Sequence, residues 1–129
     1  MIKALLLGLN ALMFIGFGLG FILVPDTVTP LFLGVPAPEG DLLVDMQATY
    51  GGLSLAAGLY MARCAIIRQF LVQGLLVAFL VAACVLVGRI AGVQAAVDPG
   101  PAMYQSLWLE VVLTILFGGL YLSGRRGGE

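Results

Sequence analysis

Three ionisable residues lie inside long apolar stretches of this sequence, where charge is costly. They are Asp45, Arg89 and Glu110, each in a different stretch. A charged residue at the centre of a membrane helix costs about 2.5 to 3.5 kcal/mol on insertion scales, so such residues pair with one another or serve a function. One guanidinium can bind a carboxylate through two N–H groups, or bridge two acids. The sequence therefore predicts that Arg89 pairs with Glu110 or with Asp45.

Other polar residues share helix faces or depths with the two acids. Ser106, Glu110 and Thr114 recur at steps of four residues, which places them on one side of a helix. Asp45 and Thr49 share a face in the same way. Adding the polar residues at similar depth, the expected cluster consists of Asp45, Gln47, Tyr50, Arg89, Ser106, Glu110 and Thr114.

The residue inventory removes most catalytic, metal-binding and nucleic-acid-binding chemistry. There is no histidine, and the two cysteines, Cys64 and Cys84, form no C-x-x-C pair. We therefore predict no metal site, no cofactor and no catalytic nucleophile of the Ser-His or Cys-His type. A net charge of -1 provides no basic field for nucleic acid. A non-enzymatic role is preferred, with an enzyme left open.

Three interpretations of the polar cluster are open. The preferred one is a buried ion network that fixes how the helices pack. The second is a ligand pocket that opens toward the outer face of the membrane. The third and least favoured is a path for protons or ions, because only Thr114 and Tyr121 continue the polar stripe toward the inner side.

Composition and hydropathy place these residues in a membrane protein. Of the 129 residues, 61% are hydrophobic and 10% are charged, whereas about 25% are charged in an average soluble domain. A membrane-spanning helix needs roughly 20 apolar residues. Such runs occur at 4–24, 42–62, 69–93 and 103–123. We expect one domain over residues 1–129, an all-α membrane protein built as an antiparallel bundle of four transmembrane helices.

The basic residues predict the orientation of this bundle. Five of the six lie on one side of a four-span arrangement, at Lys3, Arg63, Arg68, Arg125 and Arg126. Because cytoplasmic loops are rich in Lys and Arg, both termini and the link from Arg63 to Arg68 are expected on the cytoplasmic side of the membrane. The polar cluster then lies in the outer half. Reading the first run as a signal peptide is disfavoured, because a signal core has only about 7 to 15 apolar residues.

The connector at 25–41 contains four prolines and a short apolar piece at 31–35. Five residues are too few to cross a membrane. We expect an ordinary interfacial loop here, in preference to a lid folded over the bundle.

Small residues spaced by four positions predict close helix packing. In a membrane, apolar burial does not drive helix association, and small side chains let backbones approach. Such pairs are Gly16 and Gly20, Gly52 and Ala56, Ser54 and Gly58, Ala78 and Ala82, and Gly88 and Gly92. They favour a tight bundle over loosely connected helices.

Several short motifs resemble those of a family of small bacterial four-helix membrane proteins, known only as a domain of unknown function. They are Tyr50-Gly51-Gly52, Gly88-Arg89, Glu110, and the stretch from Val24-Pro25-Asp26 to Leu33-Gly34. The family pattern has an arginine where this sequence has Gln47, so an arginine-dependent role does not carry over to the second helix. The resemblance implies the same helical bundle in a bacterial inner membrane, but it does not indicate an activity. The layout is also similar to that of DoxX-type proteins, which are often accessory subunits.

Two functional hypotheses follow. The preferred one is a non-enzymatic accessory or scaffold subunit, with membrane lipids and either a membrane-protein complex or a homo-oligomer as partners. The alternative is a binder or enzyme for a lipid-like or quinone-like molecule in an outer pocket. In that case Arg89 would hold an anionic or carbonyl group, with Glu110 and Tyr50 as proton partners. A transporter ranks last, because there is no inverted repeat.

Overall fold

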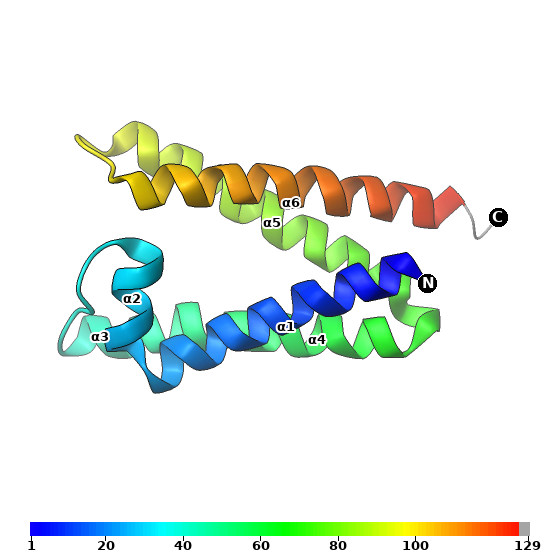
Figure 1. Cartoon of the computed structure of the whole chain (residues 1–129), viewed down its shortest axis with the longest axis horizontal. Coiled ribbons are helices and arrows are strands. Elements are labelled where there is room, and N and C mark those ends of the chain that lie inside the picture. Colours follow the sequence, from blue (N-terminus) through cyan, green and yellow to red (C-terminus); the bar gives the residue numbers. More distant parts are fainter. Residues whose placement is uncertain (127–129) are drawn as a thin grey trace.

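The computed structural model describes residues 1–126, and this part of the chain is helical without a strand, as expected for an all-α protein (Figure 1). Two long connections separate the helices, at 34–40 and 96–100. The elements in chain order are α1 (Ile2–Leu23), α2 (Pro25–Leu33), α3 (Asp41–Met46), the π-helical segment η1 (Gln47–Leu53), α4 (Ser54–Ile66), the 3-10 turn η2 (Arg68–Phe70), α5 (Leu71–Ala95) and α6 (Pro101–Arg126).

Proline and glycine determine where several helices begin and end. Val24 leaves the helical conformation (φ -138°, ψ 54°), as a residue before proline tends to do, and Pro25 then begins α2. Gly34 ends α2 with φ 72°, a left-handed conformation that glycine adopts without a steric penalty. Pro101 is the first residue of α6. The chain turns at these points because of local backbone chemistry.

Three helices are long and apolar enough to cross a membrane: Ile2–Leu23, Arg68–Ala95 and Pro101–Arg125. Large apolar side chains such as Leu12, Val87 and Ile115 point outward from them and are 65%, 67% and 70% exposed. Such faces suit contact with lipid. The structure therefore supports a membrane protein, as predicted.

The second predicted span, 42–62, is less regular than the other three. It consists of α3, η1 and α4, and η1 is a π-helix with wider turns. The backbone stays helical where these pieces join, at Gln47 (φ -63°, ψ -38°) and at Ser54 (φ -64°, ψ -43°). One rod therefore runs through all three elements, and its hydrogen-bond pattern changes in the middle.

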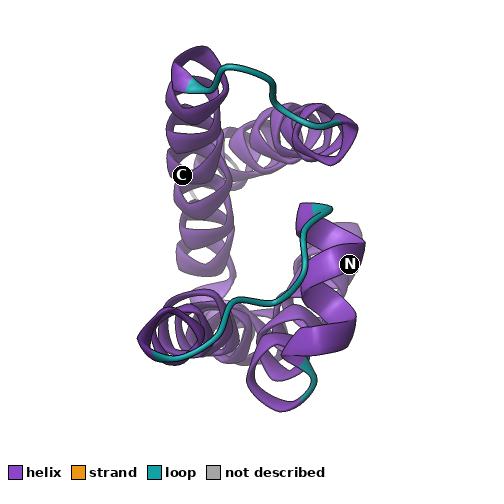
Figure 2. Cartoon of the chain, turned by 90° about the vertical axis from the view of Figure 1, so that its left-hand side faces the viewer, coloured by secondary structure: helices purple, strands orange, loops and turns teal. Residues whose placement is uncertain are grey.

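The long helices form two antiparallel hairpins. The first pairs α1 with the η1–α4 rod, and the second pairs α5 with α6 along their lengths (Figure 1). The hairpins meet at the end that contains the α4–α5 link and move apart toward the other end. Figure 2 looks onto this wide end, where the long connecting loops lie. The two hairpins therefore pack together at one end only, whereas a tight bundle was expected.

A buried core joins the two hairpins at their common end. Its fully or almost fully buried members are Leu7, Ala11, Met61, Cys64, Leu75, Ala78 and Phe117. At Gly74 a Cβ atom would lie 2.5 Å from Cys64 Cβ, so α4 and α5 touch there with no room for a side chain. This core holds the narrow end of the molecule together.

Close helix contact within the first hairpin depends on Gly58, which the four-residue spacing predicted, and on Gly18, which it did not. A Cβ at Gly18 would lie 2.6 Å from the Leu55 backbone nitrogen, and one at Gly58 would lie 2.9 Å from the Ala11 carbonyl oxygen. By contrast, a Cβ at Gly16 or Gly52 would meet nothing within 4 Å. The four-residue spacing was therefore right for Gly58 and wrong for Gly16 and Gly52, which lie beside the contact surface.

The same difference occurs in α5. A Cβ at Gly88 or Gly92 would also meet nothing within 4 Å. These residues lie toward the wide end, where the hairpins have separated. Their predicted role in close packing inside the chain is therefore wrong.

The connector after α1 is a helix rather than the expected interfacial loop. Within α2, Thr29 is fully buried and its hydroxyl lies 3.8 Å from Met46 Sδ. The end of α2 approaches α6, since a Cβ at Gly34 would lie 3.5 Å from Ala102 Cβ. Figure 1 shows α2 standing between the two hairpins at the wide end. This element bridges the gap, a position closer to the alternative of a lid.

Candidate functional site

An ion pair joins α5 to α6 in the wide half of the molecule. Arg89 Nη2 lies 2.6 Å from Glu110 Oε1, and Arg89 Nε donates to both carboxylate oxygens at 2.7 Å. Glu110 is 9% exposed, and the Arg89 side chain is 20% exposed. The first of the two predicted pairings of Arg89 is therefore present. The short charge-assisted contacts are of the strong type.

Beyond Glu110, Arg89 has one weak hydrogen-bond acceptor within the described residues, and the nearby hydroxyl groups of α6 do not bond to the charged groups of the pair. Arg89 Nη1 has Met103 Sδ as its acceptor at 3.5 Å. The Thr114 hydroxyl donates to the Glu110 backbone carbonyl one turn earlier in α6 at 2.7 Å, so this threonine bonds within its own helix and leaves the carboxylate to Arg89. Ser106, one helical turn before Glu110, is partly buried and forms no side-chain hydrogen bond within residues 1–126. Of the three residues predicted to form a polar stripe on α6, Glu110 is therefore the one whose side chain bonds to Arg89.

Asp45 does not join the pair. It is exposed, and no ion pair links it to Arg89 in the part of the chain that the structure describes. Its backbone carbonyl accepts a hydrogen bond from the Thr49 hydroxyl at 2.7 Å. The alternative in which one guanidinium bridges two acids is therefore wrong, because Asp45 belongs to the other hairpin and the hairpins diverge.

Gln47 has a structural contact. Its Nε2 donates to the Ile22 backbone carbonyl at 3.0 Å, so it ties η1 to the last turn of α1. A carbonyl in the last turn of a helix has no partner in its own helix. Gln47 supplies that partner and fixes the wide end of the first hairpin.

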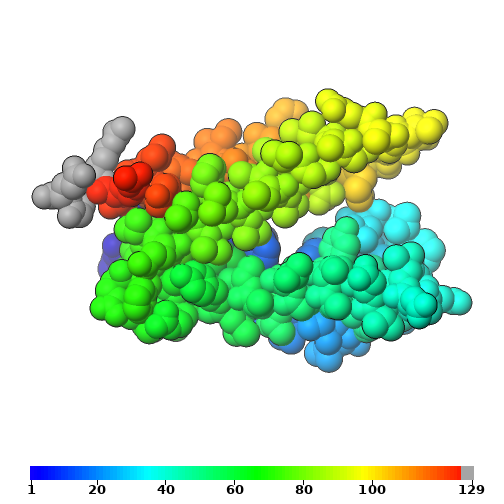
Figure 3. Space-filling view, turned by 180° about the vertical axis from the view of Figure 1, so that it is seen from behind, coloured from blue at the N-terminus to red at the C-terminus, as the bar shows by residue number. Residues whose placement is uncertain are grey.

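A cavity of about 600 Å³ opens between the hairpins. Seen from behind, the molecule is hollowed between α5 and the rod that contains η1 and α4 (Figure 3). The volume lies within the range of about 300 to 1,000 Å³ that holds small molecules. The lining residues come from α1, η1, α4 and α5 and are Phe14, Thr49, Tyr50, Leu53, Ser54, Ala57, Val81, Cys84, Val85, Gly88 and Arg89.

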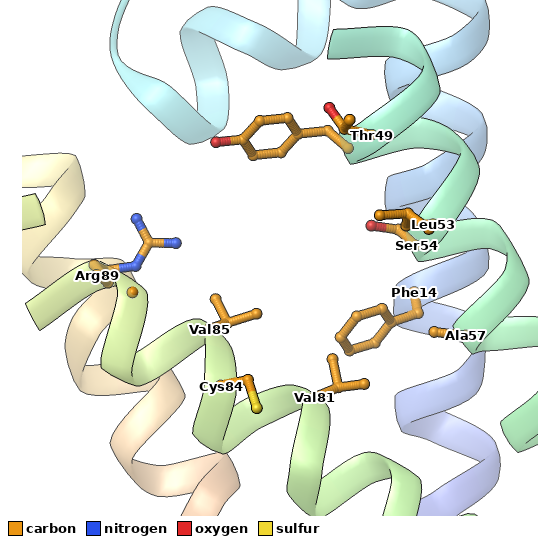
Figure 4. Close-up of a pocket in the computed structure, with 11 residues that line it drawn as sticks. Phe14, Thr49, Leu53, Ser54, Ala57, Val81, Cys84, Val85 and Arg89 are labelled. Atoms are coloured by element: carbon orange, nitrogen blue, oxygen red, sulfur yellow. The ribbon is translucent and has the colours of Figure 1, made fainter. Parts of the chain in front are cut away.

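One cation and a few hydroxyl groups interrupt an otherwise apolar wall. Arg89 turns its guanidinium toward the open space, while Thr49 and Ser54 come from the facing rod (Figure 4). Tyr50 lines the same wall and stacks on Phe21, with ring centroids 5.5 Å apart and an interplanar angle of 28°. Arg89 therefore serves both the ion pair and the cavity.

The comparison with family models identifies the relatives of this chain. The model described as "Domain of unknown function (DUF4345)" matches residues 2–121. The chain belongs to the DUF4345 family. The predicted membership of an uncharacterised family is thereby confirmed. Comparisons with curated proteins and with solved structures found no match.

The DUF4345 match extends from the start of α1 into the last third of α6. It therefore includes both members of the ion pair and every residue that lines the cavity. Ion pair and cavity thus belong to the DUF4345 part of the chain and not to an added segment.

Sequence reasoning missed most of the cavity wall in this DUF4345 protein. Phe14, Leu53, Val81 and Val85 looked like ordinary lipid-facing or core residues, because apolar spacing does not reveal where two hairpins separate. The π-helix was missed as well. Its signal, if any, is the Gly51-Gly52 pair in the middle of a span, where glycine weakens a regular helix.

Among residues 1–126, no three Cys, Asp or Glu side chains are close enough to hold a metal ion. The chemistry that the DUF4345 chain offers in this region is therefore one arginine, its carboxylate partner, the Cys84 thiol and neutral hydroxyls beside an apolar surface.

Proposed function

We propose that this chain is a four-span protein of a bacterial inner membrane, with both termini in the cytoplasm. The α3–η1–α4 rod supports a fourth span, because η1 and α4 pack antiparallel against α1, which is itself long and apolar enough to cross a membrane. The start of α1, the α4–α5 link and the end of α6 share one end of the molecule (Figure 1). That end carries Lys3, Arg63, Arg68 and Arg125, and by the positive-inside rule it faces the cytoplasm.

Within this protein, the cavity binds a lipid-like or quinone-like molecule. The observation that carries the proposal is the position of Arg89, which borders an apolar hollow of about 600 Å³ instead of being enclosed by packing. An ion pair that served only to align α5 and α6 would need no such space beside it. Ligand sites combine an apolar wall with a few polar groups that orient the ligand, and this wall has that composition.

Filling the cavity tests the proposal. The substitution Val85→Trp places a large ring in the wall, whereas Val87→Trp lies on the same helix but outside the cavity lining. Native mass spectrometry of protein purified in mild detergent should show a retained small molecule in the wild type and in Val87→Trp, and none in Val85→Trp. Equal retention by the two variants would place the molecule elsewhere, and no retention by the wild type would argue against binding.

A second candidate is the accessory or scaffold subunit, and the open face of α5 favours it. Gly92 has nothing within 4 Å of its Cβ position and lies outside the cavity lining, which ends in α5 with Gly88 and Arg89, so a helix of another protein could approach there. Under this proposal, mild-detergent purification yields a stable complex, and Gly92→Leu dissociates it. Repeated isolation of a lone protomer would contradict the proposal.

A further inference from the structure

We infer that the cavity ligand has an uncharged carbonyl group at its polar end and that Arg89 Nη1 donates to this carbonyl oxygen. The inference rests on the proposed binding of a lipid-like or quinone-like molecule and specifies its chemistry. It concerns a choice that the sequence left open, between an anionic group and a carbonyl group on Arg89.

The first step is that Arg89 keeps donors for a ligand. Nε and Nη2 face Glu110, whereas the acceptor of Nη1 is a thioether sulfur, Met103 Sδ, at 3.5 Å. A thioether is a weak acceptor. Within residues 1–126, Nη1 thus has no oxygen acceptor. Because Arg89 lines the cavity, a ligand oxygen there would improve on the existing contact.

The second step is charge. Glu110 already neutralises Arg89 at 2.6 Å, and Arg89 is the one charged residue in the described cavity wall. An anionic ligand would therefore bring an uncompensated negative charge into an apolar environment, which is costly. A carbonyl oxygen accepts the same hydrogen bond without that cost. The closed pair thus selects against anions.

The third step is the wall opposite Arg89, which is neutral. Tyr50 and Ser54 provide hydroxyl groups that form no side-chain hydrogen bond within the described residues. Each can donate to a second oxygen of the ligand, as an ester or a quinone ring possesses. The remaining wall, with residues such as Phe14 and Val81, suits a hydrocarbon chain.

Cys84 provides a direct measure of cavity occupancy. Its thiol is exposed and lines the cavity, whereas Cys64, the other cysteine, is fully buried in the core. The rate at which methyl methanethiosulfonate modifies Cys84 in the full-length chain in detergent can be followed by intact-protein mass spectrometry. Three probes are compared: hexadecyl acetate, a decyl quinone with a fully substituted ring, and hexadecyl sulfonate, which is anionic at every working pH.

At a concentration about ten times its Kd, a bound probe leaves roughly one tenth of the cavities free, so we expect hexadecyl acetate, the quinone or both to slow modification of Cys84 by about tenfold. The sulfonate at the same concentration should leave the rate unchanged. Protection by hexadecyl acetate alone would indicate a lipid ester as the ligand, and protection by the quinone alone would indicate a quinone. Protection by the sulfonate equal to or greater than that by both carbonyl probes would overturn the inference but leave ligand binding intact. No protection by any probe would overturn both.

The role of Glu110 in this selection has its own test. Glu110→Gln leaves Arg89 uncompensated, so the sulfonate should now protect Cys84 at least as well as the acetate. Asp45→Asn removes the same charge from an exposed residue outside the cavity lining and should preserve the wild-type order of probes. An unchanged order in Glu110→Gln would overturn the charge argument. The wild-type comparison decides the inference even where the variant does not fold.

Discussion

The Arg89–Glu110 pair has two consequences at the scale of single residues. It connects α5 to α6 at a point where the rest of the interface is apolar, and it determines the charge of the cavity wall. The pairing could be predicted from the sequence, because two opposite charges in neighbouring spans have few alternatives in lipid. The cavity beside it could not, since it depends on how far the hairpins separate.

Breaking the ion pair should destabilise the protein more than removing it altogether. Glu110→Met leaves Arg89 charged and unpaired in an apolar region, which for a pair that retains some exposure should cost about 1 to 3 kcal/mol. The double substitution Arg89→Met with Glu110→Met should recover part of this loss, because neither charge remains. Thermal unfolding in detergent measures both. A double variant that is no more stable than Glu110→Met alone would contradict this account.

Asn10 provides a second residue-scale prediction. Its Nδ2 lies 3.3 Å from Met61 Sδ, while its Oδ1 is buried and has no partner in the described structure. A buried polar atom without a partner is costly, so Asn10→Leu should leave stability unchanged or raise it by about 1 kcal/mol. If thermal unfolding shows that Asn10→Leu instead lowers the free energy of unfolding by more than about 1 kcal/mol, Oδ1 acts as a hydrogen-bond acceptor in the protein.

At the scale of elements, the sequence predicted the long helices well and the irregular ones poorly. Apolar length and flanking prolines located α1, α5 and α6 to within a few residues. The short helix α2 was hidden by its prolines. Pro25 occupies the first helical position, where proline is tolerated, whereas Pro30 lies inside the helix, where proline is unfavourable. The π-helical turn leaves no pattern in composition. Sequence signals therefore located a helix correctly where its apolar run was as long as a membrane span.

The glycines of α1 allow a matched test of helix contact. Gly18→Ala should destabilise the first hairpin by about 1 to 3 kcal/mol, because the added methyl group would meet the Leu55 backbone at 2.6 Å. Gly16→Ala adds the same methyl group where nothing lies within 4 Å and should be neutral or stabilising, since alanine favours helix. Thermal unfolding of the two variants decides. An equal effect at both positions would mean that α1 packs on α4 through another face.

At the scale of the whole molecule, the charge distribution predicts the topology. A reporter active only in the cytoplasm, such as a fluorescent protein, should work when fused after Arg125, and alkaline phosphatase, active only outside it, should work when inserted near Glu39 in the connector between α2 and α3. Phosphatase inserted beside Arg68 should be inactive. Activity there would invert the proposed orientation.

The separation of the hairpins at one end has a mechanical consequence for the surrounding bilayer. The hairpins touch at the end with the α4–α5 link and diverge at the end with α2 (Figure 1). In the proposed four-span arrangement, the protein would therefore occupy more area in one leaflet than in the other. Lipids around such a tapered body relax best when the membrane bends so that the leaflet with the broad end is stretched. When reconstituted vesicles are sorted by diameter, molecules inserted with the broad end outward should be enriched in the smallest ones.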